Sequence, residues 1–206
     1  MAEIEHPQIY LVTPPSFELS SYGSTLESVL DAVPVACLRL ALASHDEDEI
    51  ARAADLCRDI THARDIALVI SNHVLLAERL GLDGVHLDDT HSVRAARKTL
   101  GEEAIVGLHA GVSRHDGMNG GEAGADYICF GPVGENALGD GAVVERELFD
   151  WWSKVIELPV VAEGGLDEQS IRELAPMTDF FALGDEIWSD PDPVARIKTL
   201  YGVMTA

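Results

Sequence analysis

A few polar side chains interrupt apolar stretches of this sequence at positions suited to chemistry. Arg39 lies in the otherwise apolar run Val35–Leu42, where an always-charged guanidinium must reach an anion or the end of its strand. We therefore predict that Arg39 binds an anionic ligand, with a structural ion pair as the alternative. His86 and His109 each end another apolar run, and histidine is well suited to proton transfer near neutral pH.

These side chains can act together only if one fold brings them to the same place. Short apolar, β-rich runs alternate with amphipathic stretches about 20 to 30 residues apart, which is typical of βαβ units and a parallel sheet. The runs are Ile9–Thr13, Val35–Leu40, Ile66–Ile70, Gly84–Leu87, Ala104–Leu108, Tyr127–Phe130, Val160–Ala162 and Phe180–Leu183. Eight runs predict an α/β fold closed as a single (β/α)8 TIM barrel, rather than a doubly wound open sheet. In either fold, ligands gather at the carboxyl ends of the strands.

Helix signals fall between these runs. Asp46 and Ser113 precede polar–apolar patterns as N-caps, while Gly81, Gly101 and Gly124 stand where C-caps are expected. The predicted helices are Thr25–Asp31, Glu47–Thr61, Val74–Leu80, Ser92–Leu100, Arg114–Ala123, Glu145–Ile156, Glu168–Ala175 and Val194–Leu200.

Composition limits the class of protein. With 206 residues and no linker or low-complexity tract, we expect one domain over residues 1–206. The net charge of -22 disfavours nucleic acid and anionic lipid as partners. We expect no membrane span, and because residues 1–7 lack a secretory signal, we expect a cytoplasmic protein. Cys37, Cys57 and Cys129 are odd in number and widely spaced, so we expect buried thiols.

Three motifs occur together at the strand ends. They read GVHL at residues 84–87, GADY-x3-GP at residues 124–132, and PVVA-x-GG at residues 159–165. In this order and spacing the sequence resembles thiamine phosphate synthase and its thiazole-tautomerase relatives over roughly residues 8–190. The resemblance implies a barrel enzyme that joins hydroxymethylpyrimidine diphosphate to thiazole phosphate and releases pyrophosphate. Its expected partners are therefore small phosphorylated heterocyclic substrates.

The resemblance carries over only part of the family's site. Arg39 is kept from the family's Gln-x-Arg-x-Lys element, whose glutamine and lysine are replaced by Cys37 and Ala41. Gly164, Gly165 and Gly184 match backbone positions that bind the thiazole phosphate. The resemblance thus implies a catalytic Arg39 and a substrate phosphate held by these glycines.

The magnesium site of the family is altered in this chain. Ser71 and Asn72 stand where the family has Asn-Asp, so we expect both to face the substrate. His91 matches a second magnesium aspartate, with Asp88 and Asp89 shortly before it. Asn72, Asp89 and His91 are the magnesium ligands that the resemblance implies, although Mg2+ prefers carboxylate and water oxygens. The alternative is that Asp88 and Asp89 open the following helix.

Other departures remove positive charge or add negative charge. The stretch 133–141 lacks the family's Thr-Pro-Thr-Lys element and is predicted to be a loop over the barrel mouth. Asp185 replaces a serine, and Glu163 replaces an apolar residue before the glycine pair. We still expect Glu163 to lie at the substrate, and Arg39, Asn72, His109 and Gly165 to face one cavity.

Three functions stay open from the sequence. The first is a synthase with a divergent site, and the second is a tautomerase-like isomerase with His109 as its base. The third is a phosphate-ligand-binding paralogue without catalysis. Convergence of His86, His91, His109 and Glu163 on a transition metal is a further alternative. Trp151 and Trp152 are neighbours on one helix, so one is expected in the core and the other at a homodimer contact.

Overall fold

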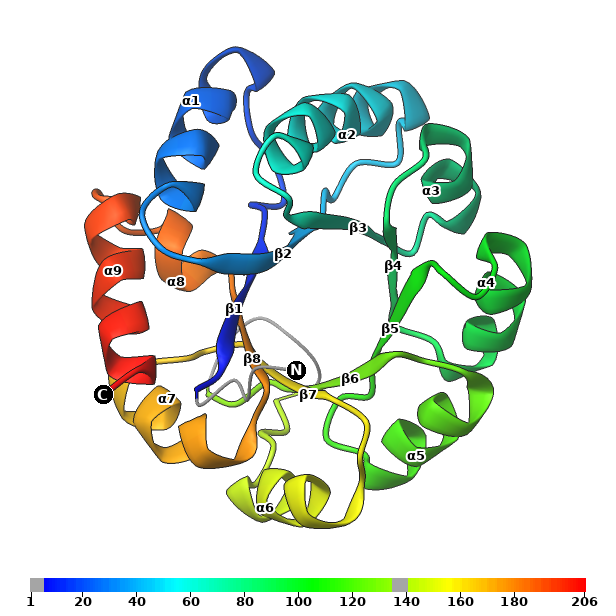
Figure 1. The fold of residues 1–206 in the computed structure, drawn as a ribbon, viewed down its shortest axis with the longest axis vertical. Helices are drawn as coiled ribbons and strands as arrows, with labels where there is room; N and C mark the ends of the chain where they lie inside the picture. The colour runs from blue at the N-terminus through cyan, green and yellow to red at the C-terminus, as the bar shows by residue number, and fades with distance from the viewer. Residues whose placement is uncertain (1–5, 135–140) are drawn as a thin grey trace.

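The computed structural model describes residues 6–134 and 141–206. Eight parallel strands close into a barrel in chain order, with β8 paired to β1 (Figure 1). The strands are β1 (Gln8–Val12), β2 (Val35–Leu40), β3 (Ala67–Ser71), β4 (Gly84–Leu87), β5 (Ile105–His109), β6 (Tyr127–Phe130), β7 (Val160–Glu163) and β8 (Phe180–Leu183). The predicted TIM barrel is confirmed, and each strand lies within a residue or two of its expected bounds.

Helices surround the barrel (Figure 1). They are α1 (Leu19–Leu30), α2 (Glu47–His62), α3 (Val74–Leu80), α4 (Val93–Leu100), α5 (Arg114–Ala123), α6 (Arg146–Val155), α7 (Glu168–Leu174), α8 (Asp185–Trp188) and α9 (Pro193–Met204), with short 3-10 turns η1 (Thr90–Ser92) and η2 (Ala175–Met177). The sequence did not predict α8, because four residues are too few to show helical periodicity.

The start of α1 differs from its prediction. The helix begins at Leu19 rather than Thr25. Serines and a glycine make this turn a weak helix former by propensity. Tertiary packing stabilises it instead, because Tyr22 is stacked on Phe17 with ring centroids 3.9 Å apart and also contacts Trp188.

The predicted helix caps are in place. Asp46 accepts from the backbone N–H groups of Asp48 and Glu49, and Ser113 accepts from that of Asp116. Gly81 and Gly124 end α3 and α5 in the left-handed conformation, and Gly101 follows α4. Residues 135–140 of the predicted mouth loop lie outside the described residues.

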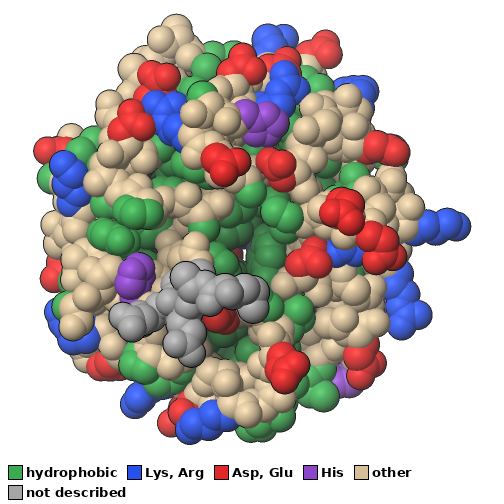
Figure 2. All heavy atoms as spheres, in the orientation of Figure 1, with side chains coloured by type: hydrophobic (Ala, Val, Ile, Leu, Met, Phe, Trp, Pro, Cys, Tyr) green, Lys and Arg blue, Asp and Glu red, His purple; other side chains and the backbone are tan. Residues whose placement is uncertain are grey.

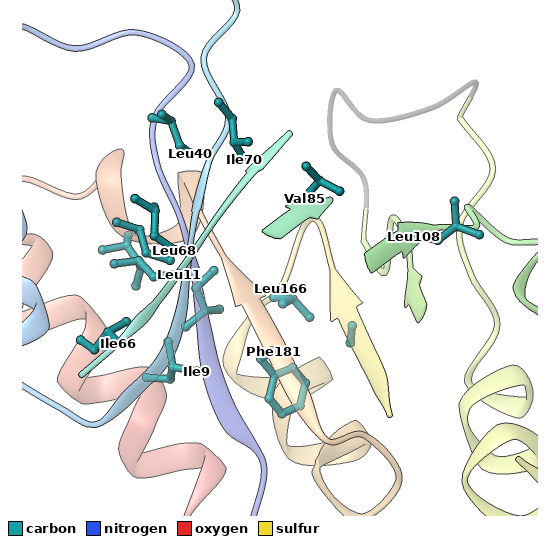
Figure 3. Close-up of a cluster of buried hydrophobic side chains, with 14 of the residues drawn as sticks. Ile9, Leu11, Leu40, Ile66, Leu68, Ile70, Val85, Leu108, Leu166 and Phe181 are labelled. Atoms are coloured by element: carbon teal, nitrogen blue, oxygen red, sulfur yellow. The ribbon is translucent and has the colours of Figure 1, made fainter. Parts of the chain in front are cut away.

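Alternate residues of each strand belong to two separate apolar layers. Ile9, Leu11, Leu68 and Ile70 are in the layer between the barrel and the helices, together with Phe181 (Figure 3). The residues between these along each strand, which have the opposite parity, form the inner layer. They are Tyr10 and Val12 of β1, Cys37 of β2, Val69 of β3, Tyr127 and Cys129 of β6, Val161 of β7 and Ala182 of β8. Because side chains alternate along a strand, the polar residues that share this parity also point into the barrel.

The remaining sequence expectations can be checked on the described residues. All three cysteines are free and buried. Trp152 is buried in the core, while Trp151 is partly covered by the Arg114 guanidinium, 4.1 Å from its ring centroid. No described helix has the length and apolar character that crossing a membrane requires.

Candidate active site

Arg39 and Glu163 form a bidentate ion pair inside the barrel. Arg39 follows Cys37 by two residues on β2, and Glu163 follows Val161 by two residues on β7, so the strand pleat points both side chains inward. Arg39 Nη1 donates to Glu163 Oε2 at 3.1 Å, and Nη2 donates to Oε1. Both residues are buried, at 6% and 7% exposure. The structure therefore contains the ion pair that the sequence left as an alternative for Arg39.

The surroundings keep this pair charged. Burial by itself raises the pKa of Glu163, but the charge and hydrogen bonds of Arg39 outweigh it and lower that pKa to about 2. Burial likewise lowers the pKa of Arg39, and the Glu163 carboxylate more than reverses this effect. Glu163 thus offsets the positive charge that Arg39 presents to a ligand. One donor is left over, because Arg39 Nε is buried and has no hydrogen-bond partner among the described residues.

Two histidines lie beside the pair. His109 Nδ1 is 3.9 Å from Glu163 Oε2, and its ring centroid is 6.5 Å from that of His86. Burial, with the nearby Arg39 charge, lowers the pKa of His86. Burial also lowers the pKa of His109, where Arg39 adds to the effect and Glu163 opposes it. Both imidazoles are therefore neutral near pH 7, the form that can accept a proton.

Two tyrosines extend this network across the barrel. His86 Nδ1 is 2.9 Å from the Tyr127 hydroxyl, which is 2.7 Å from the hydroxyl of Tyr10. The Tyr127 ring fits because residue 107 is glycine, where a Cβ atom would lie 2.0 Å from that ring. His86 is thus held in place by buried hydroxyl groups.

Cys129 is a site residue that the sequence analysis missed. Its Sγ donates to Glu163 Oε2 at 3.0 Å. It also lies in register with His109 on the neighbouring strand. A usable signal was present in the sequence, since Cys129 has the inner parity of β6, but the cysteine was expected only to be a buried thiol.

A cavity of about 350 Å³ opens beside the ion pair at the carboxyl ends of β1, β2, β7 and β8. Its described lining consists of Val12, Thr13, Pro15, Arg39, Ala41, Glu163, Gly164, Ala182, Gly184, Asp185 and Glu186. Asn72, His109 and Gly165 are not among these lining residues, although His109 Nδ1 lies 3.9 Å from Oε2 of the lining residue Glu163, so one cavity shared with Arg39 stays a prediction. Arg39 is the only cation in the described lining, against three carboxylates. Acidic side chains are also spread over the face shown in Figure 2.

The carboxylate of Glu186 occupies backbone donors beside this cavity. Its Oε1 accepts from the N–H of Leu166 at 3.0 Å, and its Oε2 accepts from that of Gly184 at 2.9 Å. Gly164 and Gly165 have φ of 84° and 68°, values that favour glycine. Gly184, one of the three glycines that the resemblance assigns to a phosphate, thus already donates its amide to an acidic side chain of the same chain, which the sequence did not predict.

The residues expected to hold magnesium do not converge. The Asn72 side chain donates to Asp88 Oδ2 at 3.0 Å and accepts from the Asp88 N–H at 3.2 Å. Asp89 caps the following turn by accepting from the His91 N–H and the Ser92 hydroxyl. This arrangement fits the helix-opening alternative for Asp89, whereas Asp88 is bonded to Asn72.

The two other residues of this region have different surroundings. His91 lines an outer cavity with residues of α4 and α5, and Ser71 ends β3 half-buried. Magnesium requires several oxygen ligands around one point. Asn72, Asp89 and His91 as placed here do not fit that ion.

Known proteins resemble this chain over nearly its whole length. Residues 9–184 match the family described as thiamine monophosphate synthase. A protein of Rhodospirillum centenum named thiamine-phosphate synthase is 37% identical over 204 residues, covering 96% of this chain and 97% of that protein. One of the same name from Erythrobacter litoralis is 38% identical, covering 95% of each chain.

A solved structure agrees in fold. Thiamine phosphate pyrophosphorylase from Pyrococcus furiosus superposes with a TM-score of 0.82 at 20% identity, covering 96% of this chain and 95% of that one. An orotidine 5'-phosphate decarboxylase from Pyrococcus horikoshii superposes with a TM-score of 0.71 at 12% identity, which reflects the barrel alone. The family model and the two near full-length relatives show that this chain belongs to the thiamine monophosphate synthase family.

Proposed function

We propose that this protein is a thiamine-phosphate synthase, which joins hydroxymethylpyrimidine diphosphate to thiazole phosphate and releases pyrophosphate. The proposal is supported by family membership and by relatives of that name matching nearly the whole chain. The carrying observation in the structure is the cavity at the carboxyl ends of the strands, whose one described cation is Arg39. Ligands of parallel barrels bind at this end.

Several residues of this chain would contribute to the synthase reaction. A departing pyrophosphate requires preorganised positive charge and donors, since the reaction needs little acid–base catalysis. Arg39 supplies the charge, and its Nε is a donor without a protein partner among the described residues. The Gly184 amide can receive the thiazole phosphate once Glu186 releases it. Magnesium would supply further charge neutralisation, but no step is assigned to it because the expected ligands do not fit.

We expect slow turnover, because this chain differs from the family in the charged groups at the site. The family's lysine is absent, and Glu163 offsets the charge of Arg39. Loss of one preorganised donor typically lowers kcat by roughly 10²–10³-fold. We therefore expect the purified chain to release pyrophosphate from the two substrates well below the rate of the Rhodospirillum centenum relative.

One observation favours a second function, the isomerase. Neutral His109 lies beside an ionised carboxylate, which is a suitable arrangement for a base that moves a proton on a thiazole ring. Proton exchange into thiazole phosphate without pyrophosphate release would identify this activity. Binding of thiazole phosphate without either reaction would identify the non-catalytic paralogue.

The test uses the full chain with both purified substrates, with and without Mg2+. Pyrophosphate release that depends on both substrates is expected. An Arg39→Met/Glu163→Leu variant keeps the interior filled and uncharged, and it should lose this release while remaining folded. No release above the uncatalysed rate from the folded wild-type chain would contradict the proposal. We also propose that the protein acts in the cytoplasm, and as a homodimer.

A further inference from the structure

Four consecutive strands place one metal-binding side chain each at the same point inside the barrel. They are His86 on β4, His109 on β5, Cys129 on β6 and Glu163 on β7. One ligand atom from each lies within 4.8 Å of the others. We propose that His86, His109, Cys129 and Glu163 form a binding site for one transition-metal dication, for which Zn2+ is the best match.

The spacing suits a tetrahedral ion. Zinc bonds of about 2.0–2.3 Å place neighbouring ligand atoms roughly 3.3–3.8 Å apart. The observed upper limit of 4.8 Å therefore needs only a contraction of roughly 1 Å. Cys129 Sγ and Glu163 Oε2 are already 3.0 Å apart, and His109 Nδ1 is 3.9 Å from the same oxygen.

The identity of the donors selects the metal. Two imidazoles, one thiolate and one carboxylate suit zinc and related borderline ions, whereas magnesium prefers oxygen ligands alone. Three of the four residues are buried, and apolar inner-layer residues such as Val69 and Val161 surround them. This cluster includes Cys129 in place of His91, which lies on the outer side of the barrel.

Neighbouring groups already orient the ligands. His86 contacts Tyr127 through Nδ1, which leaves Nε2 to bind a metal, and Tyr127 in turn contacts Tyr10. Glu163 is held by Arg39 through both carboxylate oxygens, and its Oε2 also faces Cys129 and His109. Such outer partners fix ligand geometry in known metal sites.

The site goes beyond the proposed synthase activity. It takes an ion to which the proposed synthase reaction assigns no step, and its occupancy can be measured without any substrate. A chain that binds zinc without releasing pyrophosphate would support the metal site and contradict the synthase. A chain that releases pyrophosphate without binding zinc would do the reverse.

The experiment uses the full chain, first treated with a chelator and then dialysed against Zn2+ or Co2+. One zinc per chain is expected by atomic absorption. With cobalt, we expect the visible bands of tetrahedral Co2+ and the near-ultraviolet band of a thiolate–cobalt bond. Failure to bind either ion stoichiometrically would overturn the proposal.

Variants assign the ligands. Cys129→Ser should abolish the thiolate–cobalt band, and His109→Gln should weaken zinc binding at least about tenfold. Cys37→Ser and His91→Ala should change neither, since Cys37 lies at the opposite end of the barrel and His91 on its outer side. A thiolate band that survives in Cys129→Ser, or unchanged zinc affinity in folded His109→Gln, would overturn the site. If Cys129→Ser does not fold, zinc binding by His109→Gln tests the site instead. His109 is the least buried of the four ligands, so its substitution disturbs folding least.

Discussion

The Glu186 carboxylate accepts the backbone N–H of Gly184 at 2.9 Å, at the position where relatives are expected to hold a substrate phosphate. A second hydrogen bond ties the same carboxylate to the N–H of Leu166. An acidic side chain of the protein thus competes with an acidic ligand for the same donors. The first prediction follows from this competition.

Removing the competitor should strengthen phosphate binding. Glu186→Ala frees the Gly184 and Leu166 amides and removes a negative charge from the cavity. A hydrogen bond to a charged group contributes about 1.5–3 kcal/mol, so affinity for inorganic phosphate should rise about tenfold or more. Isothermal titration calorimetry measures this, with Glu173→Ala as the exposed control on α7. Equal affinity of wild type and Glu186→Ala would show that these amides do not bind phosphate.

Breaking the buried ion pair should destabilise the barrel. Glu163→Ala leaves the guanidinium of Arg39 buried without its partner, which typically costs about 3–5 kcal/mol. Urea unfolding should show this loss in the free energy of unfolding. The Arg39→Met/Glu163→Leu variant should recover most of it, because no unpaired charge remains. A double variant as unstable as Glu163→Ala would argue against this explanation.

The N-terminus of α7 should show a pH-dependent contribution to stability. Asp167 and Ser170 form a capping box, and the hydrogen bonds from Ser170 lower the pKa of Asp167 below its ordinary value. The stabilisation is therefore complete above the ordinary pKa and is lost as pH falls through the lowered folded value. Asp167→Ala should cost about 1 kcal/mol at neutral pH.

Unfolding experiments on the wild type and on Asp167→Ala, at pH 7 and about pH 3, test whether the stability from Asp167 falls with pH. The difference between the two proteins should shrink at the lower pH. A difference that grows on acidification would contradict the role of the ionised cap.

Residue 107 should tolerate no side chain. In Gly107→Ala the new Cβ atom would lie 2.0 Å from the Tyr127 ring, so the buried network must shift. Overpacking of this kind typically costs about 1–3 kcal/mol. Gly202→Ala is the matched control, since its added Cβ has no described atom within 4 Å beyond its chain neighbours and the α9 backbone, and α9 should gain about 0.5–1 kcal/mol. Thermal unfolding should show a lower Tm for Gly107→Ala and a higher Tm for Gly202→Ala. Equal changes in Tm would show that steric overlap at Gly107 is unimportant.

The sequence by itself determined the barrel and the inward direction of its strand residues. Apolar runs spaced by helices, with caps such as Asp46 and Gly81, are local signals that need no long-range contact. Alternation along the strands then assigned Arg39, His109 and Glu163 to the interior, because successive side chains point to opposite faces.

Only the tertiary structure decided which of these side chains meet. Arg39 and Glu163 are 124 residues apart in sequence, and their pairing depends on how the closed barrel sets the register of its strands. Glu186 reaches Gly184 only because α8 turns its carboxylate back onto the strand end, and α8 carries no sequence signal of its own. His91 was the expected member of the histidine cluster, but it follows the end of β4 and packing turns it toward an outer cavity, whereas the pleat of β6 points Cys129 into the barrel.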